Sequence, residues 1–183
     1  DLHSFPTRRS SDLWQTLSLW SGELTFFHRD ITDRITYVRN AEIGRYENFG
    51  EVTYQGCELS MTWRPSEAVE FTSSYMYLHA RNEESGRWLP AVPFHTLTGE
   101  VVLRPFRRLS VRAEAKYAGK VFPGSDNRSS QPDYTVVHLR ADYRTGPFRF
   151  YCSVDNLFDR EYRYVDGYDA PPREWLVGMN CNF

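Results

Sequence analysis

The sequence predicts an all-β fold, an antiparallel up-and-down meander of about eight strands that are long enough to cross a membrane. Three observations predict it: apolar and polar residues alternate, the alternating segments run for about 10 to 13 residues, and the connections are alternately short and long. Strands of soluble sheets usually have about 5 to 6 residues, whereas a tilted membrane crossing needs about 9 to 11. Strand length therefore favours a membrane barrel over a soluble sandwich.

The clearest expected strand is Leu109–Val121, in which apolar odd positions alternate with polar residues such as Arg112, Glu114 and Lys116. This period of two indicates a strand with one wet face and one apolar face. In a membrane barrel the charged face lines the lumen and the apolar face contacts lipid. The other expected strands are Glu23–Val38, Val52–Arg64, Val69–Ala80, His95–Arg104, Tyr134–Arg144, Phe148–Leu157 and Arg173–Phe183.

The expected connections fall into two kinds. Three are tight turns that contain Pro or Gly, the residues that turn geometry favours. Four are long loops rich in Gly, Pro, Asn, Asp and Arg. Short turns on one side and long loops on the other are typical of an outer-membrane barrel, with the turns and the C-terminus in the periplasm. The turns are Pro65–Ala68, Pro105–Arg108 and Thr145–Pro147, and the loops are Arg39–Gly50, Asn82–Pro93, Phe122–Pro132 and Phe158–Pro172.

Composition excludes several classes of function. The net charge is −2, which disfavours nucleic-acid binding, because such proteins normally carry a basic face. The mean hydropathy of −0.60 and the short apolar runs exclude a transmembrane helix. Cys57, Cys152 and Cys181 have no metal-ligand spacing, and the histidines form no catalytic motif. We therefore expect neither a metal site nor an enzyme.

The first thirteen residues, "DLHSFPTRRSSDL", have neither the apolar core nor the cleavage pattern of a secretory signal. They resemble the conceptual translation of a DNA-sequencing adapter. We interpret Asp1–Leu13 as a non-native tail and Trp14–Phe183 as the segment that folds. The alternative is an ordinary polar N-terminal tail.

The end of the chain carries a more specific pattern. In "FRFYCSVDNLFDREYRYVDGYDAPPREWLVGMNCNF" one strand ends on "NLFD" at 156–159, Tyr162 follows, and a strand containing Gly178 ends on Phe183. These features resemble the final hairpin of TonB-dependent outer-membrane receptors. The stretches "FGEVTYQGCELSMTWRP", "SSYMYLHA" and "LPAVPFHTLTGEVVLRP" are similar to preceding strands of that family. Cys181 stands where the family usually has an aromatic residue.

The resemblance implies that the chain is the C-terminal segment of a larger outer-membrane β-barrel whose plug domain lies upstream. It implies a receptor in the outer membrane of a Gram-negative bacterium for uptake of a scarce nutrient, such as a siderophore–iron complex or cobalamin. The implied partners are outer-membrane lipid, the outer-membrane assembly machinery and a TonB-type energy-transducing protein acting on the plug, with no cofactor. Two alternatives stay open: a self-contained eight-stranded barrel with a structural or adhesive role, and a soluble sugar-binding β-sandwich.

The family's long loops contact its ligands, which makes Trp88, Arg163, Tyr164 and Tyr168 candidate ligand-binding residues. The alternative is that these residues only fill the loops. Charged residues of the expected polar faces could line a ligand path, but such residues more often form a solvated network in the lumen, which is the interpretation adopted. These residues are Arg112, Glu114, Lys116, His138, Arg140 and Asp142.

The terminal strand "REWLVGMNCNF" resembles the signal read by the outer-membrane assembly machinery, and Trp175, Gly178, Cys181 and Phe183 are its expected determinants. Deletion of Phe183 is expected to reduce membrane insertion.

Two of the cysteines raise the question of a disulfide. If the last hairpin is centred near Val165–Asp166, Cys152 and Cys181 lie opposite each other, which would allow a disulfide in the periplasm. The alternative is that both are small apolar residues facing lipid.

Overall fold

The structure, a computed structural model, describes residues 9–14, 19–40, 43–165 and 168–182. One sheet of nine antiparallel strands has the order β1-β2-β5-β6-β7-β8-β9-β10-β13, and β3-β4 and β11-β12 form two small sheets. The main strands are β1 (Arg9–Trp14), β2 (Trp20–Thr32), β5 (Glu51–Ser66), β6 (Val69–Asn82), β7 (His95–Phe106), β8 (Leu109–Ala118), β9 (Tyr134–Thr145), β10 (Phe148–Asp155) and β13 (Glu174–Cys181). The small sheets comprise β3 (Ile35–Asn40), β4 (Ile43–Asn48), β11 (Arg163–Val165) and β12 (Tyr168–Asp169).

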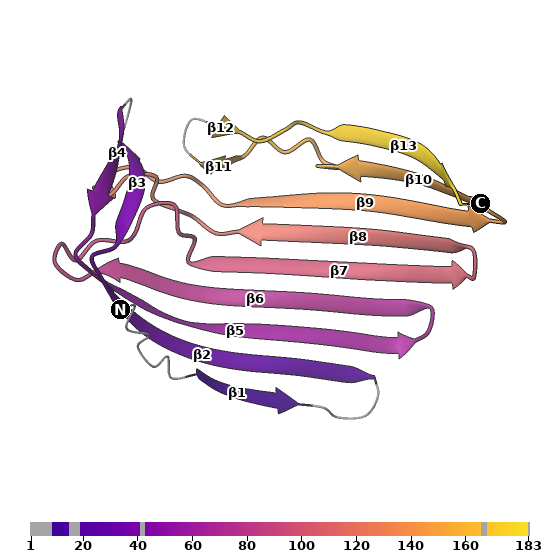
Figure 1. Ribbon diagram of the computed structural model, residues 1–183, viewed down its shortest axis with the longest axis horizontal. Coiled ribbons are helices and arrows are strands. Elements are labelled where there is room, and N and C mark those ends of the chain that lie inside the picture. Colours follow the sequence, from indigo (N-terminus) through magenta and orange to yellow (C-terminus); the bar gives the residue numbers. More distant parts are fainter. Residues whose placement is uncertain (1–8, 15–18, 41–42, 166–167, 183) are drawn as a thin grey trace.

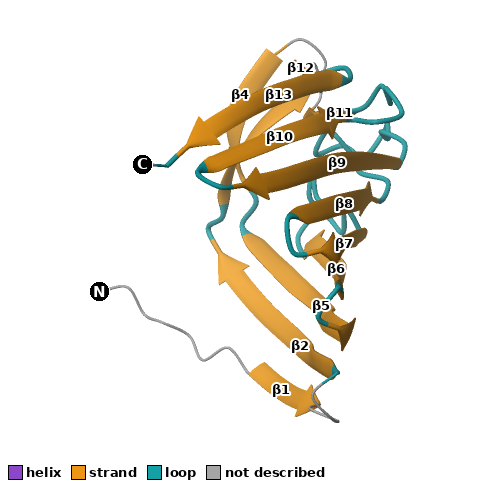
Figure 2. Ribbon diagram, turned by 90° about the vertical axis from the view of Figure 1, so that its right-hand side faces the viewer, coloured by secondary structure: helices purple, strands orange, loops and turns teal. Residues whose placement is uncertain are grey.

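The predicted antiparallel meander is confirmed (Figure 1), and the strands from β2 to β13 in the main sheet correspond to the eight expected ones. The sheet follows an arc from β1 to β13 (Figure 2). In the described part of the chain β1 and β13 each pair with one neighbour only, so these strands form an open wall rather than a closed barrel. No helix of the described residues is long and apolar enough to cross a membrane.

β1 overlaps the stretch Asp1–Leu13 that the sequence predicts to be a non-native tail. Its backbone pairs with β2 from Arg9, opposite Phe27, to Trp14, opposite Gly22. This backbone pairing does not depend on where the residues come from, so the interpretation of Asp1–Leu13 as a non-native tail stays a prediction.

Short turns and long connections lie at opposite ends of the strands (Figure 1). Two-residue turns join β5 to β6, β7 to β8 and β9 to β10, with Ser66, Phe106 and Thr145 as the last paired residues before each turn. The first two hairpins have a register shift where Pro65 and Pro105 lie, because proline has no N–H for the ladder. β13 ends at the side of the sheet that carries these turns.

The expected strand Glu23–Val38 and the expected loop Arg39–Gly50 are wrong in their boundaries. β2 ends at Thr32, because Asp33 adopts a φ of 54°, a left-handed conformation that breaks the ladder. The chain then forms the separate β3–β4 hairpin within the long connection to β5. The connection after β10 likewise contains the short β11–β12 pair instead of an unstructured loop.

The two faces of the main sheet differ as predicted. One cross-strand row on the apolar face contains Trp20, Trp63, Phe71, Val101, Ala113, Leu139, Val154 and Trp175. The adjacent row on the polar face contains Ser21, Thr62, Thr72, Glu100, Glu114 and His138. Trp20 and Trp63 stack with ring centroids 5.1 Å apart. On this face Trp20, Phe26, Leu59, Leu97, Phe150 and Trp175 are exposed, as expected for a surface whose solvent is lipid.

The core lies on the polar face, at the end that carries the long connections. Phe49, Val52, Ala80 and Leu89 are buried together, and Val52 is fully inaccessible. Val52 and Ala80 come from β5 and β6, whereas Phe49 and Leu89 come from the connections. The connections therefore pack against the inner face of the wall instead of standing free of it.

Candidate functional site

A cavity of about 440 Å³ lies between the β8–β9 connection and the β10–β13 connection. Tyr134 and Tyr162 stand side by side in it, with ring centroids 4.5 Å apart and the rings tilted by 32°. Arg160 and Arg163 supply cationic groups. The charged lining also includes Asp133, Glu161 and Asp169. Such a mixture of aromatic rings and a few charged groups is typical of a site that binds a small polar ligand.

The "NLFD" motif holds one side of this cavity. Asn156 is 3% exposed and adopts a φ of 53°. Its side-chain oxygen accepts a hydrogen bond from the Arg160 N–H (2.8 Å), and its side-chain nitrogen donates to the Arg160 carbonyl (2.9 Å) and the Pro171 carbonyl (3.3 Å). Asn156 thus joins the start of the connection to its end and fixes the backbone at Arg160. The motif is structural, and it sets the position of a cavity residue.

Asp159 reinforces the same closure. Its carboxylate accepts a hydrogen bond from the Arg173 N–H at 2.8 Å, and its own φ is 55°. Asn156 and Asp159 therefore hold together the two ends of the β10–β13 connection, which contains the β11–β12 pair.

The predicted ligand-binding residues do not all lie together. Arg163 lines the cavity, where its Nε is 2.6 Å from a carboxylate oxygen of Asp169. Tyr168, on β12, is 68% exposed and is not among the lining residues. The side chain of Tyr164 lies outside the described residues. Trp88 belongs to another connection.

Trp88 is half-buried in an aromatic cluster instead of lining the cavity. Its ring meets His79 edge-on at 4.5 Å and Phe94 at 4.8 Å, both measured between ring centroids. Asn127, with a φ of 53°, accepts a hydrogen bond from the Trp88 N–H (2.8 Å) and donates to the Trp88 carbonyl (3.0 Å). This clamp ties the β6–β7 connection to the β8–β9 connection.

The cavity residues Tyr134, Tyr162, Arg160 and Asp169 were not among the sequence candidates. Tyr134 starts a strand and Tyr162 belongs to the C-terminal motif, so neither stands out as a ligand residue by spacing. Only Arg160 could have been identified from the sequence, because it directly follows "NLFD" and a capped strand end fixes the residues that follow it.

At the base of the β3–β4 hairpin, Arg34 lies over the ring of Tyr54 at 5.0 Å from its centroid. Burial, and then the nearby charge of Arg29, lower the pKa of the Arg34 guanidinium from its ordinary value. The Arg34 carbonyl accepts a hydrogen bond from the Phe49 N–H at 2.8 Å. Arg34 thus anchors this hairpin beside the core.

The expected lumen network is present on the polar face. Arg112 pairs with Glu100 at 3.2 Å, and Arg140 with Asp142 at 2.9 Å. His138 lies 3.0 Å from a carboxylate oxygen of Asp155. Glu114 and Lys116 occupy the same face of β8 by alternation.

The residues of the proposed assembly signal fall on both faces of β13. Trp175 is 68% exposed on the apolar face. Gly178 is opposite Tyr151 on the polar face, and Cys181 is opposite Phe148. Phe183 lies outside the described residues.

A Cys152–Cys181 disulfide is incompatible with this register. Cys152 pairs with Val177, four residues from Cys181, and all three cysteines are free. Four strand residues span roughly 13 Å, whereas the Cα atoms of a disulfide lie within about 7 Å. The hairpin is centred between residues 164 and 165, about one residue before the expected point and two residues before the centre that would place the two thiols opposite each other.

Comparison with known proteins agrees with this architecture. The sequence model of the family described as "TonB dependent receptor-like, beta-barrel" matches residues 10–157. The iron-regulated outer membrane virulence protein of Vibrio cholerae is 28% identical over 93% of the chain and 30% of its own length. The ferrienterobactin receptor of Escherichia coli K12 is 26% identical over 90% of the chain and 27% of its own length.

Solved structures give the same fold. The ferric-catecholate import receptor Fiu of E. coli K12 superposes with a TM-score of 0.75 at 26% identity, covering 94% of the chain and 27% of Fiu. The siderophore receptor PiuA of Acinetobacter baumannii has a TM-score of 0.76 at 20% identity, over 93% of the chain and 27% of PiuA. The chain thus spans less than a third of these relatives. Its strands have the fold of one part of such a barrel, and the chain belongs to the TonB-dependent receptor-like β-barrel family.

Proposed function

We propose that this chain is the C-terminal segment of a receptor that imports ferric catecholate siderophores across the outer membrane, with a TonB-type protein supplying the energy. The observation that carries the ligand class is the set of relatives: the E. coli proteins are named a ferrienterobactin receptor and a catecholate siderophore receptor. The fold alone does not select the ligand, because a copper transporter has the same fold at 16% identity and a TM-score of 0.74.

The loop cavity supports the ligand class. Ferric catecholates are anionic and aromatic, so they suit a site with neighbouring aromatic rings and guanidinium groups. Tyr134 and Tyr162 offer the rings, and Arg160 offers a guanidinium on a residue whose backbone is fixed by Asn156. In the complete receptor this cavity would form one part of a ligand site whose other walls come from outside this chain.

The open edges of the sheet support the segment over the alternative of a self-contained barrel. A membrane barrel must close, since an unpaired strand edge in lipid is costly. With β1 and β13 unpaired to each other in the described part, closure needs further strands.

We further propose that Asp1–Leu13 is not part of the natural receptor. Resequencing the locus with different adapters tests this proposal, and recovery of the same codons would refute it.

Growth on defined iron sources tests the ligand class. The full-length gene, recovered by sequencing upstream of this segment, is expressed in an E. coli strain that lacks its own catecholate receptors. We expect growth on ferric enterobactin that is lost when tonB is deleted. Growth supported only by a ferric hydroxamate, or only cobalamin uptake in a matched assay, would refute the catecholate proposal. Arg160→Ala should raise the half-saturating concentration of ferric enterobactin, while Arg87→Ala, on an exposed turn, serves as the control.

A further inference from the structure

The β7–β8 turn is the cationic one of the three short turns of the wall. Its two turn residues are Arg107 and Arg108, which directly follow Phe106. The β5–β6 turn consists of Glu67–Ala68, and the β9–β10 turn consists of Gly146–Pro147. Closing a two-residue turn does not require arginine, since Gly, Pro, Asn and Asp are the residues that turn geometry favours. The two arginines therefore call for an explanation other than the turn itself.

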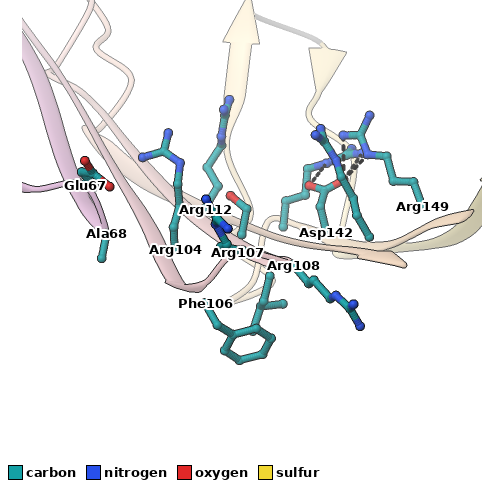
Figure 3. A pocket seen from close by; sticks show the side chains of 13 residues that line it. Glu67, Ala68, Arg104, Phe106, Arg107, Arg108, Arg112, Asp142 and Arg149 are labelled. Carbon is teal, nitrogen blue, oxygen red and sulfur yellow. Dashed lines mark hydrogen bonds and ion pairs between the residues drawn. The ribbon is translucent and has the colours of Figure 1, made fainter. Parts of the chain in front are cut away.

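A bulge turns Phe106 onto the apolar face of the wall. Leu103 and Phe106 pair with residues of β8 that are only two apart, so β7 has one extra residue at this point. Simple alternation from Leu103 would place Phe106 on the polar face, whereas the extra residue places it on the apolar face. The ring is 55% exposed, and Figure 3 shows it on the opposite side of the ribbon from Arg104 and Arg112.

Phe106 begins an apolar row that crosses five strands at this end of the wall. Each member of the row is the direct cross-strand partner of the next, and most of them are large and exposed. In a barrel this surface contacts the acyl chains of the lipid. The row consists of Phe106, Leu109, Tyr143, Phe150 and Met179. The two arginines thus come directly after the first member of a lipid-facing row.

The arginines on the polar side of the same region are already compensated. They surround a hollow of about 820 Å³, in which Figure 3 shows the contacts of Asp142 as dashed lines. Four of them pair with carboxylates of the wall at 2.7–3.3 Å; these are Arg104, Arg112, Arg140 and Arg149, with Glu70, Glu100 and Asp142 as partners. Arg144 belongs to the same face by alternation from Asp142. These side chains are therefore not part of the site considered below.

Arg107 and Arg108 differ from these arginines. In the part of the chain that the structure describes, no hydrogen bond or ion pair is found for either side chain. The Arg108 carbonyl accepts a hydrogen bond from the Arg144 N–H at 2.8 Å, which attaches the turn to β9. Figure 3 shows the Arg108 side chain on the same side of the ribbon as Phe106. A guanidinium group without a carboxylate partner thus lies beside an aromatic ring at the edge of the lipid-facing surface.

The position of the two arginines matches the phosphate layer of a bilayer. Aromatic residues of a barrel mark the interface, and the headgroups begin where the acyl region ends. The alternation of turns and loops predicts that this turn lies at the periplasmic side, where the leaflet consists of phospholipids. The fork of arginine binds phosphate oxygens with paired hydrogen bonds. The ammonium group of a zwitterionic phospholipid neutralises its own phosphate, so two adjacent arginines favour a lipid with a net negative charge.

We propose that Phe106, Arg107 and Arg108 form a site for an anionic phospholipid, such as phosphatidylglycerol, in the periplasmic leaflet. The two guanidinium groups bind the phosphate, and an acyl chain lies along Phe106 and Leu109. This inference goes beyond the proposed function, because it depends on the place of the wall in the outer membrane and not on the ligand that the receptor imports.

Native mass spectrometry of the full-length receptor in detergent tests the site. The receptor is titrated with phosphatidylglycerol or with phosphatidylethanolamine that carries the same acyl chains. We expect the first phosphatidylglycerol adduct to form at a lower lipid concentration than the first phosphatidylethanolamine adduct. Arg107→Gln combined with Arg108→Gln should weaken the phosphatidylglycerol adduct by about tenfold, since two cationic side chains near the lipid phosphate are lost. The same variant should leave the phosphatidylethanolamine adduct unchanged.

Two further variants separate charge at this turn from charge in general. Arg107→Lys combined with Arg108→Lys keeps both positive charges and should retain most of the preference for phosphatidylglycerol. Arg87→Gln combined with Arg128→Gln makes the same change of charge on two exposed residues at the other end of the wall, and should leave the adduct unchanged. If the double glutamine variant at the turn loses its heat-modifiable gel migration, the single variants Arg107→Gln and Arg108→Gln replace it, each with an expected loss of about threefold.

Several outcomes would overturn the proposal. Equal affinity of the unmodified receptor for the two lipids would show that the site does not select a negative charge. An unchanged phosphatidylglycerol adduct in the folded glutamine variants, or the same loss in the Arg87→Gln, Arg128→Gln receptor, would show that the turn does not hold the lipid. Displacement of the lipid by an equal concentration of inorganic phosphate would indicate a site for free phosphate instead. No siderophore is present in these titrations, so they succeed or fail independently of growth on ferric enterobactin.

Discussion

The phenol ring of Tyr151 covers the backbone of Gly178, its direct cross-strand partner. A side-chain carbon added at residue 178 would collide with the ring and the hydroxyl of Tyr151. Arg140 lies on Tyr151, with its guanidinium carbon 4.9 Å from the ring centroid. An aromatic ring that covers a strand glycine fixes the register of the hairpin on the polar face.

We therefore expect Gly178→Ala to destabilise the full-length receptor by about 1–3 kcal/mol, because the ring has to leave its position. The measurement is the temperature at which the receptor loses its heat-modifiable gel migration. Gly99→Ala is the matched control, since a carbon added at Gly99 in β7 meets nothing within 4 Å. Combining Gly178→Ala with Tyr151→Ala should cost less than the sum of the two changes, and strict additivity would contradict the contact.

The Asn127 clamp gives a prediction about the loops. Asn127→Ala removes both hydrogen bonds to the Trp88 backbone, so the Trp88 amide should exchange with deuterium about fivefold faster, in line with the ~1 kcal/mol of a hydrogen bond. Asn127→Asp retains a side-chain oxygen that can accept the Trp88 N–H. Asn127→Gly retains only a residue that adopts a positive φ easily, so the Trp88 amide should exchange more slowly in the aspartate variant than in the glycine variant. Equal exchange in all three variants would show that the clamp does not hold the connection.

Asn156 gives a prediction that links stability to ligand binding. Asn156→Ala leaves the Pro171 and Arg160 carbonyls without their side-chain donor in a buried place, at a cost of about 1–3 kcal/mol. Arg160 loses its support, so the Kd for ferric enterobactin should rise as the unfolding temperature falls. Phe158→Ala is the neighbouring control, because its ring is 73% exposed and its removal should leave the loop cavity intact.

The register of the last hairpin is open to a direct chemical test. Val177→Cys should form a disulfide with the native Cys152 on mild oxidation, because cross-strand partners lie within disulfide range. Met179→Cys places the new thiol two residues along the same face and should stay reduced. Mass spectrometry of unreduced peptides gives the readout. A native Cys152–Cys181 crosslink in the unmodified receptor would contradict the register.

The strands could be predicted from the sequence because each has one polar and one apolar face, which gives residues such as Leu109 and Arg112 a period of two. The break at Asp33 could not, because the left-handed φ of a non-glycine residue has no signal in the alternation. The register of β10 against β13 depends on how many residues the β11–β12 pair takes up, which the sequence does not reveal. Of the residues that line the loop cavity, only Arg163 was among the sequence candidates. Tyr134 and Tyr162 come together because of the course of two long connections, and these connections have no periodic pattern that a sequence could reveal.

The ion pairs of the wall also cross its short turns. Arg64 meets Glu70 across the β5–β6 turn, Glu100 meets Arg112 across the β7–β8 turn, and Asp142 meets Arg149 across the β9–β10 turn. An arginine entering a bilayer alone faces a large desolvation cost, which a partner carboxylate reduces. Each of these hairpins therefore contains a carboxylate that pairs with one of its own arginines. The hairpin, and not the single strand, is the unit that this wall can add to a growing barrel at the lowest electrostatic cost.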